Sequence, residues 1–175
     1  GEPASGKTTT MRAITDGLDQ QVFFKPFGHV VYERGFQIGV PRSQFGGTDA
    51  LSMAVQPKAV SWIDQQWKGL VLGEGDRLTN KKFFQTISQK SSVDFSIVHF
   101  IIPEWVAEIR RDWRAMELGK DPQNDTWVRG RRTKVQNVAD AFKEYVFEVD
   151  ATQSTADIVH TLRGQFPHID FLMDG

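Results

Sequence analysis

The chain has 175 residues, which is enough for one domain with a sizeable core. Its 21 Lys and Arg against 22 Asp and Glu leave a net charge near zero, as is ordinary for a soluble globule. The absence of cysteine excludes disulfides and thiolate metal sites. No apolar run reaches the length of a membrane span and no signal peptide is visible, so we expect a cytoplasmic protein without a membrane partner.

The first eight residues form the pattern G-x-x-x-x-G-K-T, from Gly1 to Thr8. In such a loop, backbone N–H groups surround a β-phosphate and the following helix adds its positive N-terminal end. We expect Lys7 to reach the β- and γ-phosphates and the Thr8 hydroxyl to ligate Mg²⁺. An ordinary Gly-rich turn is the alternative, but a helix-like run follows and ends before Gly17. The residues expected to bind ATP and Mg²⁺ are Gly1, Ser5, Gly6, Lys7, Thr8 and Thr9.

The position of this loop in the chain leads to a second expectation. A buried parallel strand runs into such loops, and no residue stands in front of Gly1. We therefore expect a parent sequence with a short apolar run upstream, and a gap in the middle of the sheet of the chain as given. The alternative is that this chain is an inactive fragment.

Short β-rich runs alternate with helix-like segments along the rest of the chain, which is typical of a parallel sheet flanked by helices. The turn at 33–35 predicts a hairpin, and Pro57 is expected to kink or divide a helix. The predicted strands are 22–24, 29–32, 36–40, 69–72, 95–102 and 145–149, and the predicted helices are 8–14, 49–67, 81–89, 104–115, 133–142 and one capped by Ser154. We expect a single α/β domain over 1–175, with three layers, a mainly parallel sheet and an Arg-rich helical lid near 104–134.

The second informative motif is an apolar run that ends in Gly73-Glu74-Gly75-Asp76-Arg77. In phosphate-loop folds the strand beside the loop presents a carboxylate near Mg²⁺ and the attacking group. Such a carboxylate can hold a metal-bound water or accept a proton. Glu74 is the favoured base or metal ligand, Asp76 is the alternative, and Arg77 could clamp the acceptor. A turn with solvated charges is the competing interpretation.

A Gly-rich segment precedes Thr48 and Asp49. Either residue could simply cap the following helix. In the functional interpretation Asp49 lies over the acceptor pocket, with Arg42 as a phosphate or base contact just upstream.

Basic residues outnumber acids between Arg110 and Lys134, which suits a polyphosphate or nucleic acid unless they form a solvated helix face. We expect this segment to close over the phosphates and neutralise charge in the transition state. The candidate lid arginines are Arg129, Arg131 and Arg132, and spacing does not show which one points inward.

The aromatic and imidazole side chains receive a structural interpretation. We expect Trp105 and Trp113 in the core, and the same for Trp127, although Trp127 could instead stack on a base. His99 lies inside an apolar strand and is expected to be a satisfied core residue. The turn at 150–154 could pack against adenine, or could serve only as a helix cap.

Taken together, these motifs resemble the P-loop kinase superfamily, in its nucleoside and nucleotide kinase branch. The matching parts are the loop at 1–8, Glu74 to Arg77, Arg129 to Arg132, and the turn at 150–154. Thymidylate kinases place an Asp-Arg pair after the corresponding strand and deoxynucleoside kinases a Glu-Arg pair, and this chain has elements of both with Gly75 inserted. The chain is also similar to kinases of tailed bacteriophages, some of which phosphorylate 5-hydroxymethyluracil in DNA, and a phage origin would place it in the host cytoplasm.

The resemblance implies a kinase that uses ATP and Mg²⁺ to phosphorylate a nucleoside, nucleotide or nucleobase hydroxyl. Hydroxymethylated DNA is the alternative acceptor, and an ATPase without an acceptor is the alternative of another class. The expected catalytic residues are Lys7, Glu74, Asp76, Arg77, Arg129, Arg131 and Arg132. The expected acceptor contacts are Arg42, Asp49 and Arg77, and the expected metal ligands are Thr8 and Glu74.

Overall fold

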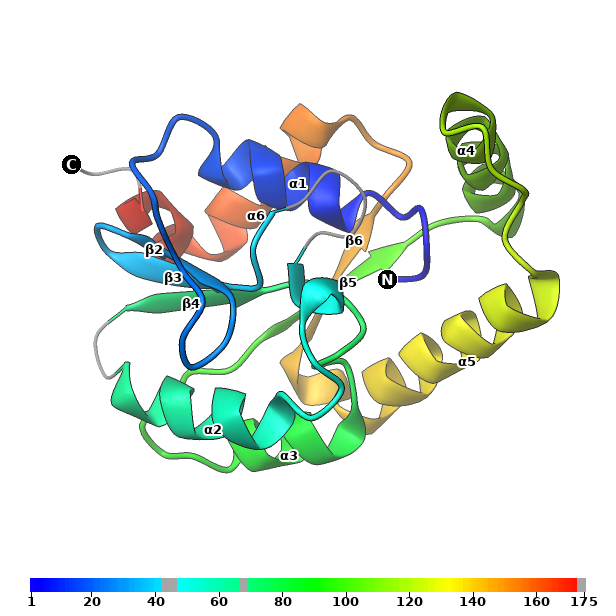
Figure 1. The fold of residues 1–175 in the computed structure, drawn as a ribbon. Coiled ribbons are helices and arrows are strands. Elements are labelled where there is room, and N and C mark those ends of the chain that lie inside the picture. The colour runs from blue at the N-terminus through cyan, green and yellow to red at the C-terminus, as the bar shows by residue number, and fades with distance from the viewer. Residues whose placement is uncertain (42–46, 67–68, 173–175) are drawn as a thin grey trace. The chain divides into compact units, whose positions relative to one another are not determined.

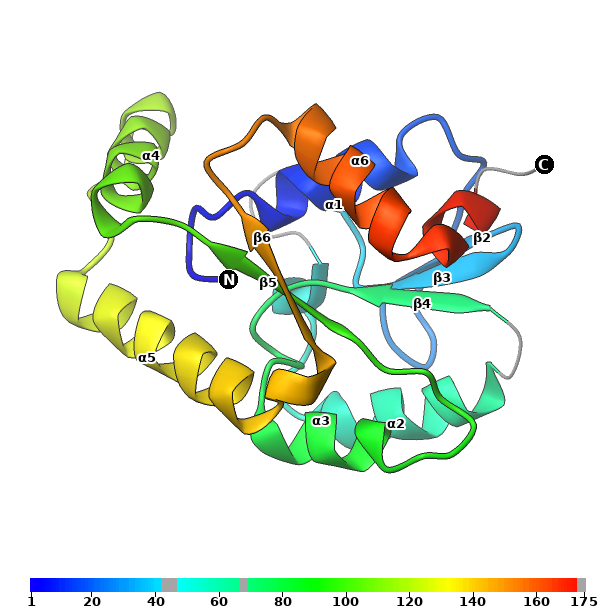
Figure 2. The same cartoon turned by 180° about the vertical axis from the view of Figure 1, so that it is seen from behind.

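The computed structural model describes residues 1–41, 47–66 and 69–172 (Figures 1 and 2). The chain divides into two compact units. The first unit combines Gly1–Lys7 with Phe95–Ile158, and the second combines Thr8–Asp94 with Val159–Gly175. Helices α1 (Lys7–Thr15) and α6 (Thr155–Gln165) each continue from one unit into the other. The expected single domain over 1–175 stays a prediction.

The second unit contains a mixed four-stranded sheet in the order β1-β2-β3-β4. Its strands are β1 (Gln21–Phe23), β2 (His29–Tyr32), β3 (Gly35–Ile38) and β4 (Leu70–Gly73). The pairs β1–β2 and β2–β3 are antiparallel, and β3–β4 is parallel. The predicted hairpin is confirmed, since the tight turn after Tyr32 pairs β2 with β3. A mainly parallel sheet had been predicted, and for this sheet the prediction is wrong. The tight turn is one reason, because it forces β2 and β3 to run antiparallel.

Helices cover both faces of this sheet (Figures 1 and 2). The part of α1 and of α6 that belongs to this unit lies on one face, and α2 (Gln56–Gln65) and α3 (Lys81–Ser88) lie on the other. Pro57 stands in the first turn of α2, where proline is tolerated, so the predicted long helix is divided rather than kinked. Residues 47–50 form a separate 3₁₀ turn, and Trp67 lies outside the described residues.

The core of the second unit is built around the strands and α2. Val30 and Ile38 are almost fully buried. The Trp62 ring lies 5.3 Å from the ring of Phe27 and 4.9 Å from that of His29, as distances between centroids. Aromatic rings at these separations pack in edge-on or tilted contact, which fixes α2 against the hairpin.

The first unit contains a two-stranded parallel sheet, β5 (Ile97–Ile101) and β6 (Val146–Asp150). The crossover between these strands consists of α4 (Glu104–Glu117), α5 (Asp125–Ala141) and a 3₁₀ turn at Lys143–Tyr145. Helix α5 begins earlier than the predicted start near 133, because the Asn124 side chain accepts a hydrogen bond from the backbone N–H of Trp127 at 3.1 Å. The predicted Ser154 cap is confirmed, since its Oγ accepts from the backbone N–H of Asp157.

The prediction that three tryptophans pack in the core is wrong. Trp105, Trp113 and Trp127 are 65%, 63% and 44% exposed. The four-residue spacing on α4 does form a stripe, but the buried side of that helix is marked by Ala107, which is fully buried. Helical periodicity identifies a face and does not say which face turns inward. His99 is buried as expected, but its Nδ1 has no hydrogen-bond partner among the described residues, and the nearest carboxylate oxygen given for it, Oε1 of Glu148, lies 3.7 Å away.

Candidate functional site

The residues of the opening loop wrap around the ammonium group of Lys7. The Lys7 Nζ donates hydrogen bonds to the carbonyl oxygens of Gly1 at 2.9 Å and Glu2 at 2.8 Å, and to the Ser5 Oγ at 3.2 Å. Ala4 and Gly6 have left-handed backbone, with φ of 64° and 88°. A non-glycine residue in this region is uncommon, and it marks a tightly constrained turn. The loop then enters α1 at Lys7, with Thr9 exposed on the first turn.

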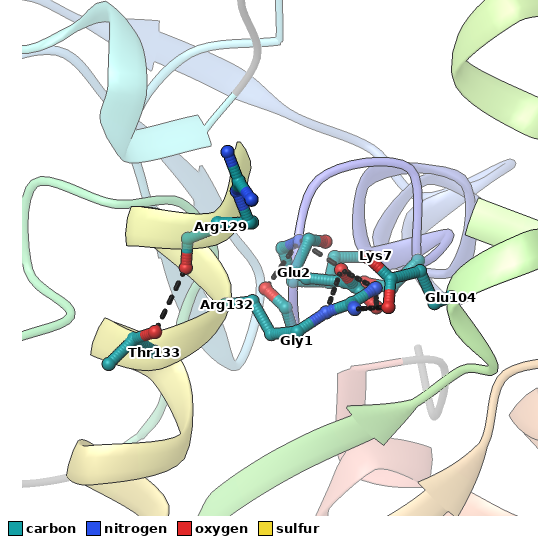
Figure 3. Close-up of polar contacts among 8 residues, drawn as sticks. Gly1, Glu2, Lys7, Glu104, Arg129, Arg132 and Thr133 are labelled. Atoms are coloured by element: carbon teal, nitrogen blue, oxygen red, sulfur yellow. Dashed lines mark hydrogen bonds and ion pairs between the residues drawn. The ribbon is translucent and has the colours of Figure 1, made fainter. Parts of the chain in front are cut away.

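A carboxylate of the loop is paired with an arginine of α5, as Figure 3 shows. The Arg132 Nε lies 2.9 Å from Oε2 of Glu2, and its Nη2 lies 3.1 Å from Oε1. The Nη1 of Arg132 lies 2.7 Å from Oε2 of Glu104, at the start of α4. Burial opposes the positive charge of Arg132, but the hydrogen bonds from Glu2 and Glu104 outweigh it and raise the pKa of Arg132 above its ordinary value. Sequence reasoning missed both acids.

In the second unit, the hydroxyl of Thr8 meets the carboxylate at the end of β4. The Thr8 Oγ1 donates a hydrogen bond to Oε1 of Glu74 at 3.0 Å. The backbone of Glu74 is fixed as well, because its carbonyl accepts from the N–H of Thr48 at 2.7 Å. Gly47 lies directly against Glu74, where an added Cβ would come closer than 3.0 Å to the carboxylate. The two predicted metal ligands are therefore in hydrogen-bond contact.

The residues that follow Glu74 are held by the segment at 47–51. The Asp49 Oδ1 accepts a hydrogen bond from the backbone N–H of Asp76 at 2.6 Å. The Arg77 Nε donates to the carbonyl of Leu51 at 3.2 Å. Neither Thr48 nor Asp49 caps α2, which begins at Gln56 after Val55. Asp49 thus orients the turn that carries Asp76 and Arg77.

The other predicted lid arginines lie on α5, near its exposed N-terminal part. The Arg131 guanidinium carbon stands 5.2 Å from the centre of the Trp127 ring, which is a cation–π contact. The carbonyl of Arg129 accepts a hydrogen bond from the Thr133 hydroxyl (Figure 3). Arg129 itself is exposed. Arg42, predicted as an acceptor contact, lies outside the described residues.

The four-stranded sheet of the second unit has helices on both faces, as in α/β proteins (Figures 1 and 2). The G-x-x-x-x-G-K-T loop that leads into α1 is typical of the phosphate-loop nucleotide-binding class. Residues 1–171 match the family model described as P-loop Nucleotide Kinase3. The chain belongs to this family, which indicates nucleotide binding and phosphotransfer. None of the curated proteins or solved structures compared with the chain matches it. Within the described residues, no helix is both long and apolar enough to span a lipid bilayer.

Proposed function

We propose that the protein is a kinase that uses ATP and Mg²⁺ to phosphorylate a hydroxyl of a nucleoside, nucleotide or nucleobase. The observation that supports this most directly is the 3.0 Å contact between the Thr8 hydroxyl and the Glu74 carboxylate. It joins a residue of the phosphate-loop motif to the acid that directly follows β4. Membership of the nucleotide kinase family supports the same reaction class.

The pair of oxygen ligands suits Mg²⁺. This ion favours oxygen donors and is commonly held by one or two carboxylates together with substrate phosphates and water. Thr8 and Glu74 supply a hydroxyl and a carboxylate at neighbouring positions. When bound, Mg²⁺ would neutralise charge on the β- and γ-phosphates. In this proposal Glu74 is the metal-side carboxylate, and either Glu74 or Asp76 accepts the proton of the attacking hydroxyl.

The remaining predicted residues take positioning and electrostatic roles. Lys7 exchanges its loop carbonyl partners for the β- and γ-phosphate oxygens when the triphosphate binds. Arg77 orients the acceptor from a turn that is fixed by Asp49 and Leu51. Arg129 and Arg131 neutralise charge in the transition state as parts of a lid. Ser5, Gly6 and Thr9 complete the ATP site, and Arg42 remains a candidate acceptor contact.

Hydroxymethylated DNA is the second candidate acceptor. The observation in its favour is the half-exposed ring of Trp127, which carries Arg131 over one face. An exposed tryptophan beside arginines is a surface on which a splayed base can stack. Nothing in this arrangement requires a polymer, so the two acceptors are separated by experiment.

The test is phosphate transfer from γ-labelled ATP to three acceptors in parallel: nucleosides, nucleotides and hydroxymethylated DNA. We expect label in one acceptor class, loss of transfer in Lys7→Ala, and no change in Lys143→Ala, an exposed lysine outside the loop. Label only in DNA would reject the small acceptor. Release of inorganic phosphate without a labelled product would reject the kinase in favour of an ATPase.

A further inference from the structure

Resting on the proposed function, we infer that Arg132 is a positioning residue of the ATP site rather than a catalytic arginine of the lid. It neutralises Glu2, an acid placed inside the phosphate loop, and fastens α5 to that loop. All the residues in this argument belong to the first unit. The inference separates Arg132 from Arg129 and Arg131, which the sequence alone had grouped together.

The contact between Arg132 and Glu2 has the geometry of a strong ion pair. Two nitrogens of the guanidinium face the two oxygens of one carboxylate, at 2.9 and 3.1 Å. The side chain of Glu2 is only 7% exposed. Fork-to-fork pairs of this kind are geometrically specific, and removing one member leaves the other charge buried and uncompensated. Glu2 therefore requires a cation at the place where Arg132 stands.

Glu2 also contacts a second cation, Lys7, which belongs to the loop itself. Its carboxylate binds Arg132, while its backbone carbonyl accepts the hydrogen bond from Lys7 Nζ at 2.8 Å (Figure 3). One loop residue thus orients both the lysine expected to reach the phosphates and the arginine of α5. A shift of Glu2 caused by loss of Arg132 would move the partner of Lys7 as well.

If Arg132 were absent, the negative charge of Glu2 would weaken binding of the triphosphate. A triphosphate tail is strongly anionic, and a carboxylate in the same loop repels it in a partly desolvated site. Glu104 is a weaker member of the cluster because its side chain is 66% exposed and screened by solvent. The favourable action of Arg132 on ATP is therefore to cancel Glu2, while its nitrogens stay occupied by the two acids.

The experiment measures ATP affinity with Mg²⁺ by calorimetry in Arg132→Gln, Glu2→Gln and the double variant, with Arg114→Gln on α4 as the matched control. We expect Arg132→Gln to raise the Kd for ATP about tenfold or more, and Glu2→Gln in the same chain to restore it to within about threefold of the unmodified protein. Inorganic tripolyphosphate should show the same pattern and adenosine should not, because the effect acts on charge. At saturating ATP, kcat of Arg132→Gln should stay within about threefold of the unmodified value.

Two results would overturn the inference. In one, Arg132→Gln binds ATP normally and loses kcat, as expected of an arginine that contacts the transferring phosphate. In the other, the double variant binds as weakly as Arg132→Gln. If Arg132→Gln does not fold, Glu2→Gln alone decides, since it must bind ATP at least as tightly as the unmodified protein. Failure of the unmodified protein to bind ATP would instead overturn the proposed function, and this inference with it.

Discussion

The position of Glu74 depends on Gly47, and this dependence can be tested with a matched pair of glycines. Gly47 has a left-handed backbone with φ of 61°, and an added Cβ would lie closer than 3.0 Å to the carbonyl and the carboxylate of Glu74. Gly17 has nearly the same backbone, with φ of 75°, but open space where the Cβ would stand. Alanine at Gly17 therefore introduces backbone strain alone, whereas alanine at Gly47 also displaces Glu74.

The expected magnitudes follow from these two terms. Left-handed backbone costs an alanine about 1 kcal/mol at either position. Displacement of Glu74 removes the hydrogen bond from Thr8 to a charged group, worth about 1.5 kcal/mol. For a chain of this length, Gly17→Ala should lower Tm by about 3 °C and Gly47→Ala by about 7 °C. Because Glu74 is the proposed metal-side ligand, Gly47→Ala should also weaken Mg²⁺-dependent ATP binding by about tenfold, with binding in Gly17→Ala unchanged.

Thermal unfolding followed by circular dichroism gives Tm, and calorimetry with and without Mg²⁺ gives the affinity for ATP. The informative quantity is the difference between the two alanine variants, because the strain that they share cancels. Equal Tm values and equal Mg²⁺ dependence in the two variants would show that Gly47 does not set the place of Glu74. The reasoning about the metal side of the site would then be wrong.

Two further predictions concern stability. Burial lowers the pKa of His99 below its ordinary value of 6.5, against the opposing pull of Glu148, so the unfolded chain binds this proton more readily. The contribution of neutral His99 to the free energy of unfolding is thus complete above about pH 6.5 and is lost as the pH falls. The drop in Tm between pH 7 and pH 5 should therefore be smaller in His99→Asn than in the unmodified protein. An unchanged drop would contradict this role of His99. Phe100 is 7% exposed and Trp113 is 63% exposed. Phe100→Ala should therefore lower Tm by about 12 °C, whereas Trp113→Ala should change it by about 2 °C or less. Similar losses of Tm in the two variants would show that Trp113 is buried after all.

Local signals in the sequence were sufficient for the elements whose conformation is set locally. The loop from Gly1 to Thr8 is recognised by its glycines and lysine, and the structure places Lys7 within it. The turn after Tyr32 predicts the β2–β3 hairpin, because a short polar turn between two β-rich segments brings these segments side by side in antiparallel orientation. The Ser154 cap was found for the same reason, since a cap involves only neighbouring residues.

Features that depend on which surfaces meet could not be obtained in this way. The stripe of Trp105, Ile109 and Trp113 has the spacing of a helix face, but Ala107 marks the side that is buried. The start of α5 was missed because Asn124 lies in a stretch that is rich in loop-forming residues, and only its hydrogen bond identifies it as a cap. Composition favoured a loop there, whereas the helix continues back to Asp125.

The ion pair between Glu2 and Arg132 is a second feature of this kind that could not be predicted from local sequence signals. The two residues are separated by 130 positions, so no local period or spacing links them. The sequence does show that Glu2 lies inside a loop expected to hold phosphate. An acid at such a position is electrostatically unfavourable unless a cation compensates it. That argument predicts that a cationic partner exists, but it does not identify which of the lysines and arginines of the chain is the partner. Only the fold selects among them, by placing the α5 turn that carries Arg132 beside the loop.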